Sequence, residues 1–206
     1  MNRLTFRIIV ALITFILGIA ATAVWFVNRP AKTKIMPVGK WEAIYFETIN
    51  KRADAANLPR LRTVNLPNGD LEVRVWIGFG INGEDGIILR RSSNQWSAVY
   101  LHGMFDRYLP AKYQEQRNLD VPKSGWDKMW QRLTGAGILT LPDATEIGCR
   151  PYVVDGIGYV VETNTNKTYR TYMYENPQFA KCSEAKQMIE ISEILYDEFG
   201  LYQQSE

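Results

Sequence analysis

The sequence has few of the residues that build metal centres and nucleophilic sites. Among its 206 residues it contains one histidine, His102, and two cysteines, Cys149 and Cys182. Zinc sites in proteins draw three or four ligands, mostly from several histidines and cysteines gathered together. The composition therefore predicts no metal site, and any Ser-His-Asp or Cys-His arrangement has to use His102.

An excess of charge of either sign is also missing. The chain has 24 lysine and arginine residues and 22 aspartate and glutamate residues. Two of the basic residues, Arg3 and Arg7, precede a hydrophobic N-terminal segment, so the rest of the chain is neutral. Because nucleic-acid binding rests on a basic surface, we predict no nucleic-acid partner.

No cofactor motif is complete. Gly78 to Gly83 match the spacing G-x-G-x-x-G and follow a predicted strand. That motif binds a dinucleotide only when a helix comes next, because the helix N-terminus holds the pyrophosphate. Here two carboxylates, Glu84 and Asp85, and another predicted strand follow instead. The pattern predicts a turn between strands and no bound cofactor.

One long hydrophobic run is present at the N-terminus. Ile8 to Val27 is twenty residues long, has no charged side chain and follows a cationic tail, residues 1–7. A helix of about 20 residues spans about 30 Å, the hydrocarbon thickness of a bilayer. We predict a single-pass transmembrane signal-anchor in the bacterial cytoplasmic membrane. The short cationic tail before the run favours a domain that faces the periplasm or the exterior.

Two alternatives to a simple anchor stay open. Ala21-Thr22-Ala23 matches the A-x-A pattern of a signal-peptidase site, so the run can also be a cleaved signal peptide. Gly18 and Thr22 have the spacing of small residues at contacts between transmembrane helices, which fits a small subunit of a membrane complex. Basic residues on both sides of the run leave its orientation open to test.

The rest of the chain reads as a linker and one globular domain. Residues 28–37 contain two prolines and no periodicity and predict the linker, and residues 38–202 form the domain. Apolar residues at helical spacing predict helices over about 39–57, 124–135 and 183–199. Short runs at 71–79, 86–91, 95–101, 152–154, 157–163 and 167–174 predict strands. The expected fold class is α+β: an N-terminal transmembrane helix, then an antiparallel sheet of five or six strands with three packed helices.

The two cysteines flank the last predicted strand pair on opposite sides. In an oxidising compartment Cys149 and Cys182 can close a disulfide worth about 3–4 kcal/mol by loop-entropy arguments. The alternative is two unrelated buried thiols. We expect the disulfide if the domain is exported.

Four side chains near the same strand pair are candidates for a binding face. If Thr165-Asn166 closes the hairpin, Tyr159, Tyr172, Tyr174 and Arg170 share one face of it. Aromatic rings beside an arginine suit a carbohydrate or protein partner. An ordinary core face beneath a helix has the same pattern, so both interpretations stay open.

Two residues are weaker candidates for catalysis. Glu162 interrupts an apolar strand and can act with a second acid, or can lie on the solvent face and pair with Lys167. His102 ends a predicted strand beside a polar stretch, residues 102–122, which predicts a long loop. The alternative for His102 is a structural side chain that anchors the loop.

One part of the sequence resembles known proteins. The segments WQRLTGAGILTLPD, DGIGYVVE, YRTYMYENP and EAKQMIEI resemble uncharacterised bacterial proteins that carry a signal or anchor and one small exported domain. The resemblance covers mainly residues 126–201 and, more weakly, LEVRVWIGFG. It implies a bacterial envelope location, and it implies no activity and no functional residues.

Together these patterns favour a membrane-tethered extracytoplasmic domain without enzymatic activity. It binds a protein or an envelope component through the Tyr/Arg face or the 102–122 stretch. The alternatives are an envelope hydrolase that uses Glu162 or His102, and the small membrane-complex subunit.

Overall fold

A computed structural model of the chain describes residues 14–15, 18–19, 32–35, 42–79, 83–104, 112–149, 151 and 156–201. The chain divides into two compact units, Met1–Lys32 and Thr33–Glu206. Of the predicted signal-anchor only residues 14–15 and 18–19 are described, and they are helical. Within the described ranges, no helix has both the length and the apolar character needed to cross a bilayer. The anchor therefore stays a prediction.

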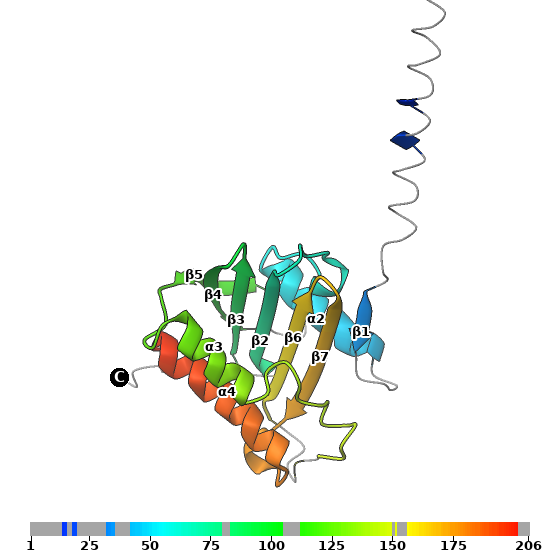
Figure 1. The fold of residues 1–206 in the computed structure, drawn as a ribbon. Helices are drawn as coiled ribbons and strands as arrows, with labels where there is room; N and C mark the ends of the chain where they lie inside the picture. The colour runs from blue at the N-terminus through cyan, green and yellow to red at the C-terminus, as the bar shows by residue number, and fades with distance from the viewer. Residues whose placement is uncertain are drawn as a thin grey trace, which may run out of the picture. The chain divides into compact units, whose positions relative to one another are not determined.

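A seven-stranded mixed sheet forms the centre of the second unit. Its strand order is β1-β7-β6-β2-β3-β4-β5, where β1 runs parallel to β7 and all other neighbours are antiparallel (Figure 1). The strands are β1 Thr33–Ile35, β2 Leu71–Phe79, β3 Glu84–Ser92, β4 Gln95–Met104, β5 Lys112–Leu119, β6 Gly158–Thr165 and β7 Thr168–Glu175. The predicted α+β class is confirmed. The predicted number of strands, five or six, was too low, and the prediction of a purely antiparallel sheet was wrong because β1 is parallel to β7.

The two unexpected strands lie at the sheet edges. β1 falls inside the predicted linker, where three residues between prolines carry no alternating pattern. β5 falls inside the predicted loop, and its side chains are exposed at every position except Tyr113 and Leu119. Edge strands often lack the apolar alternation of central strands. The predicted strand at 152–154 lies outside the described residues.

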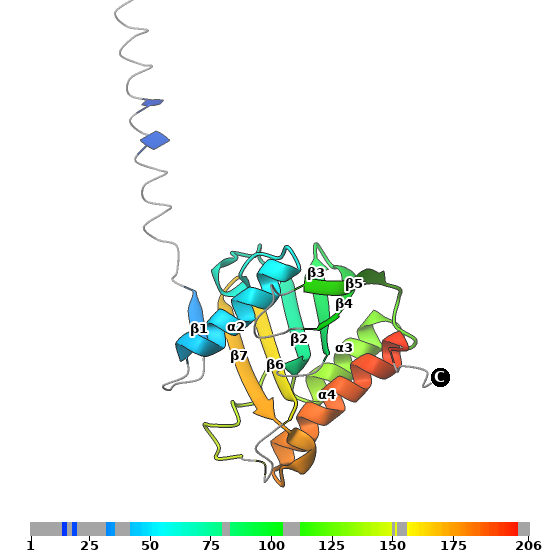
Figure 2. The same cartoon turned by 180° about the vertical axis from the view of Figure 1, so that it is seen from behind.

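Three helices cover the two faces of this sheet. α2, Glu42–Ala55, lies on one face, and α3, Trp126–Gly135, and α4, Ser183–Phe199, lie on the other (Figures 1 and 2). β2 serves both layers, because Val73 and Val75 join the core beneath α3 and α4 while Trp76 joins the core beneath α2. This central strand is therefore buried on both faces.

The β6–β7 hairpin has a register two residues away from the expected one. Thr163 faces Arg170, and Asn166 and Lys167 form the turn. A shift of two residues keeps every side chain on its face, whereas a shift of one would exchange the faces. The predicted set of Tyr159, Arg170, Tyr172 and Tyr174 therefore still lies on one side of the sheet.

Candidate functional site

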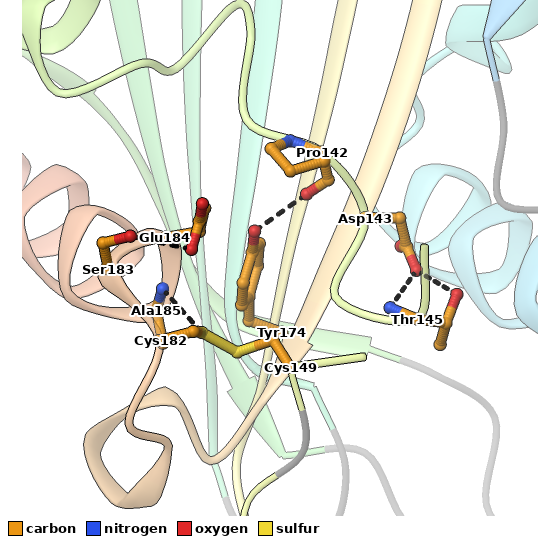
Figure 3. Close-up of a disulfide and its surroundings, with 9 residues drawn as sticks. All are labelled: Pro142, Asp143, Thr145, Cys149, Tyr174, Cys182, Ser183, Glu184 and Ala185. Carbon is orange, nitrogen blue, oxygen red and sulfur yellow. Dashed lines mark hydrogen bonds between the residues drawn. A yellow bond between two sulfur atoms is a disulfide. The ribbon is translucent and has the colours of Figure 1, made fainter. Parts of the chain in front are cut away.

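The predicted Tyr/Arg binding face is covered by the chain that follows α3. Tyr172 is 0% exposed and Tyr174 is 1% exposed. The Tyr172 hydroxyl donates to the Ile138 carbonyl oxygen at 2.9 Å. The Tyr174 hydroxyl donates to the Pro142 carbonyl oxygen at 2.8 Å (Figure 3). These two tyrosines are core residues with satisfied hydroxyl groups.

The other two members of that face are tied down in the same way. The Arg170 guanidinium donates to the carbonyl oxygens of Thr140 and Leu141 and lies 5.7 Å from the centre of the Tyr172 ring. Tyr159 packs against the same core and is partly buried. The prediction of a binding face is therefore corrected, because the segment after α3 occupies the surface that a partner would need.

The disulfide fixes one end of that covering segment. Cys149 and Cys182 are joined, with their Cα atoms 5.9 Å apart, as expected for an oxidised pair (Figure 3). Cys182 is also the N-cap of α4, where its sulfur accepts from the Ala185 N–H at 3.4 Å. Neither cysteine is a thiolate nucleophile in this state.

Glu162 is enclosed in the layer beneath α2. Its carboxylate is 1% exposed and accepts from the Trp76 indole at 3.0 Å and from the Tyr169 hydroxyl at 2.9 Å. Burial raises the pKa of Glu162, and the neighbouring Arg74 guanidinium partly opposes that rise. The solvent-face pairing with Lys167 is therefore wrong, because β6 is an inner strand with helices on both of its faces.

Further charged groups share this enclosed layer. Arg52 Nε donates to Glu84 at 2.8 Å, and Tyr113 donates to the same carboxylate at 3.2 Å. Arg74 is 0% exposed and donates to Glu72 at 2.8 Å and to the Pro59 carbonyl oxygen at 2.9 Å. Each of these two arginines pairs with a buried carboxylate. The layer is therefore a structural network of ion pairs, and its burial closes it to substrate.

His102 belongs to a different cluster on the opposite face. The β3–β4 register places Asp85 directly across from His102, with 2.6 Å between Asp85 Oδ1 and His102 Nδ1. The Tyr100 hydroxyl donates to the same Asp85 oxygen at 2.8 Å. The Tyr196 hydroxyl, from α4, donates to the other oxygen. Three donors from two layers therefore hold the Asp85 carboxylate in place.

This cluster reaches the surface, unlike the network beneath α2. The His102 side chain is 28% exposed and that of Asp85 is 17% exposed. No residue in the described part of the chain hydrogen-bonds His102 Nε2. Gly83 lies beside the ring, where an added Cβ would come within 3.5 Å of His102 Cε1. Gly83 itself therefore places no side chain against the imidazole.

The arrangement can perform acid–base chemistry. A carboxylate accepts hydrogen bonds only, so Asp85 assigns the ring proton to Nδ1 and leaves the Nε2 lone pair directed away from it. Burial raises the pKa of Tyr100 and Tyr196, and their hydrogen bonds to Asp85 raise it further, so both hydroxyls stay donors near neutral pH. An imidazole oriented in this way by a carboxylate is the base of many hydrolytic sites.

β5 adds one charged pair beside the imidazole. Glu115 faces His102 across the β4–β5 ladder, and Arg117 faces Tyr100. Arg117 Nε donates to Glu115 at 2.6 Å, and its guanidinium lies 5.1 Å from the centre of the Tyr100 ring. Both side chains are 48% exposed. In the described ranges, no group of three or more histidine, cysteine or acidic residues is arranged to hold a metal ion.

One sequence signal pointed to the Asp85–His102 pair and was missed. Ser93-Asn94 separates two predicted strands, and a two-residue turn there pairs Ser92 with Gln95. Extending that register by seven residues along each strand leads to Asp85 and His102. Tyr196 has no such signal, because its contact depends on how α4 crosses the sheet.

Comparison with known proteins provides no independent assignment. No model of a protein family matches this chain, and no curated protein matches it either. The resemblance to exported bacterial proteins therefore remains an expectation from the sequence.

Proposed function

We propose that this chain is a membrane-tethered hydrolase that acts outside the cytoplasm, with His102 as the general base. The observation that carries the proposal is the 2.6 Å contact between Asp85 Oδ1 and His102 Nδ1, at a ring whose Nε2 has no partner among the described residues. Asp85 is the positioning residue, and Tyr100 and Tyr196 hold Asp85.

The reaction step follows from this geometry. Nε2 takes a proton from a water molecule, and the water oxygen attacks an electrophilic carbon or phosphorus atom of the substrate. The resulting imidazolium, stabilised by Asp85, then returns the proton to the leaving group. General-base catalysis of this kind contributes about 10²–10⁴-fold to a rate.

The location outside the cytoplasm is supported by two features. The disulfide is typical of proteins in oxidising compartments, and the run from Ile8 to Val27 is typical of a membrane anchor. A thiol count on the unfolded, unreduced protein isolated from membranes should find no free thiol. Two free thiols would indicate a reducing compartment and contradict this part of the proposal.

Two observations support the hydrolase over the non-enzymatic binding domain. The binding domain was predicted to use the Tyr/Arg face or the 102–122 stretch, and Tyr172 and Tyr174 of that face lie in the core. The 102–122 stretch contains β5, whose polar side chains include the Glu115–Arg117 pair beside the candidate base.

The test compares the full-length protein with His102→Gln on panels of chromogenic carboxylic and phosphate esters. Lys128→Gln, an exposed position on α3, is the matched control. We expect turnover by the wild type and the control and a loss of about 10²-fold or more in His102→Gln. Equal rates for all three proteins on every substrate they turn over would overturn the proposal, and so would the absence of turnover on all of them.

A second measurement is independent of the substrate. The chain has a single histidine, so every imidazole signal in a nitrogen-resolved NMR spectrum comes from His102. We expect the neutral ring to carry its proton on Nδ1 and to change tautomer when Asp85 is replaced by Asn. A proton on Nε2 in the wild type would contradict the assigned role.

A further inference from the structure

The outer edge of β5 is the second surface of interest. β5 is the last strand of the sheet, and among the described residues β4 is its only strand partner. The five consecutive side chains from Gln114 to Asn118 are all exposed. An edge strand presents a row of backbone N–H and C=O groups that another strand can pair with. Such an edge either pairs with a further strand or carries features that prevent pairing.

The charges of β5 are complementary to themselves in one antiparallel register. If two copies of the strand pair around Gln116, each Glu115 faces the partner subunit's Arg117, and each Arg117 faces the partner subunit's Glu115. Gln114 then faces Asn118, so the amides also match. Pairs of opposite charge directly across a ladder stabilise it, whereas like charges destabilise it.

The backbone permits this register as well. Facing residues in an antiparallel pair must both direct their N–H and C=O groups toward the partner strand or both direct them away. Two copies of one strand meet this condition when the numbers of facing residues have an even sum, as they do around a single central residue. Centring the pair on Glu115 or on Arg117 also satisfies the backbone, but it places a charged residue opposite its own copy.

The strand also limits how far such a ladder can extend. The β4–β5 register shifts between His102 and Gly103, which leaves an irregularity near Gln114. A bulge of this kind shortens the regular edge and discourages pairing with unrelated strands. A short ladder suits partners that are already concentrated, and tethering both copies to one membrane raises their effective concentration.

We propose that β5 is a homodimer contact, through which two copies of this chain join their sheets antiparallel around Gln116. Residues directly opposite each other on neighbouring strands point to the same side of the sheet. The contact therefore extends the row of Asp85, His102 and Glu115 into the partner subunit. Asp85, His102, Glu115 and the partner subunit's Arg117 then follow one another on adjacent strands, about 5 Å apart. The dimer contact thus adds a cation to the row that contains the proposed base, but the contact itself does not depend on the hydrolase proposal.

Cysteine cross-linking of the full-length chain in membranes tests the register. Gln116→Cys places two thiols across the twofold axis, within reach of a short bis-maleimide. Asn118→Cys is the matched control, because it is equally exposed and shares the strand, yet its two copies are offset by four residues, or about 13 Å. We expect a linked dimer from Gln116→Cys and little from Asn118→Cys. Equal yields, or no dimer from either variant, would overturn the proposal.

Charge exchange tests the pairing itself. Glu115→Arg or Arg117→Glu alone places like charges opposite each other twice, and we expect either to weaken dimerisation by about 2- to 30-fold. The double variant Glu115→Arg/Arg117→Glu should restore it, and so should mixing the two single variants. Both residues are half exposed, so the variants should stay folded, which a thermal melt verifies. Failure of the double variant to recover dimerisation while it remains folded would contradict the proposed contact.

Discussion

The polar clusters on the two faces of the sheet differ in their exposure to solvent. Beneath α2, the charged side chains of Arg52, Glu84, Arg74 and Glu162 are all nearly inaccessible to solvent. On the other face, Asp85 and His102 lie at the rim of the core beneath α3 and α4 and stay partly exposed. Charged groups in a fold therefore do not identify a site by themselves. What distinguishes the rim cluster is an oriented imidazole, partly exposed, whose Nε2 atom has no hydrogen-bond partner among the described residues.

The largest expected effect comes from breaking the enclosed network. Replacing Arg52 with Met leaves the Glu84 carboxylate buried without its cation, which should lower the free energy of unfolding by about 3–5 kcal/mol. Chemical denaturation measures the loss. The double variant Arg52→Met/Glu84→Gln should recover most of it, because neither member of this pair is then left as an unpaired buried charge. A loss below about 1 kcal/mol in the single variant would show that the network is open to water after all.

A smaller effect is expected from pH. Burial raises the pKa of Glu84 from 4.5 to about 6, although the Arg52 ion pair opposes the rise. The folded protein thus binds this proton more tightly than the unfolded chain. The Glu84 contribution to stability is present in full below about pH 4.5 and is lost as pH rises through about 6, a change of about 2 kcal/mol.

Comparison with the variant Glu84→Gln separates the Glu84 contribution from that of the other titrating groups, because those groups are the same in both proteins. The unfolding free energies of the wild type and Glu84→Gln, measured from pH 4 to pH 7.5, should diverge across this window, with the wild type losing stability relative to the variant. If the difference is constant with pH, Glu84 has the same pKa in the folded and the unfolded protein, and the ion pair cancels the effect of burial.

The smallest expected effect lies at the rim cluster. Tyr196→Phe removes one donor to Asp85, which should cost about 1 kcal/mol in stability, because Tyr100 and His102 still hydrogen-bond the carboxylate. It should also change the chemical shifts of the His102 ring nitrogens at a fixed pH, since the carboxylate that orients the ring loses a partner. Tyr159→Phe is the control on the same face. Unchanged His102 shifts in Tyr196→Phe would show that α4 does not help to position the Asp85–His102 pair.

Residue patterns predicted most of the fold and little of the site. Alternation in β2 and helical spacing in α4 were strong signals, because alternate residues of β2 and one face of α4 are apolar and pack into the same core. β5 and β1 gave no such signal, since an edge strand does not need an apolar face. Glu162 was misplaced because a polar residue in a strand usually marks the solvent side, whereas β6 is covered on both faces.

The hairpin register shows a second limit of such reasoning. The turn that starts at Asn166 instead of Thr165 moved every β6–β7 pair by two residues without changing a face. The tyrosines were therefore grouped correctly, but their covering could not be foreseen. It depends on the irregular segment after α3, whose path is set by carbonyl contacts with Tyr172, Tyr174 and Arg170.

The short strand β1 has a mechanical consequence. It is the first element of the second unit, so any pull along the N-terminal segment enters the domain there. Only three residue pairs, from Thr33–Thr168 to Ile35–Arg170, join β1 to β7, whereas each pair of inner strands is joined by seven or more. Under load β1 should separate first and lengthen the tether by a few residues. The other six strands, held by longer ladders, would remain assembled, so β1 would detach from the sheet while the rest of the domain stays folded.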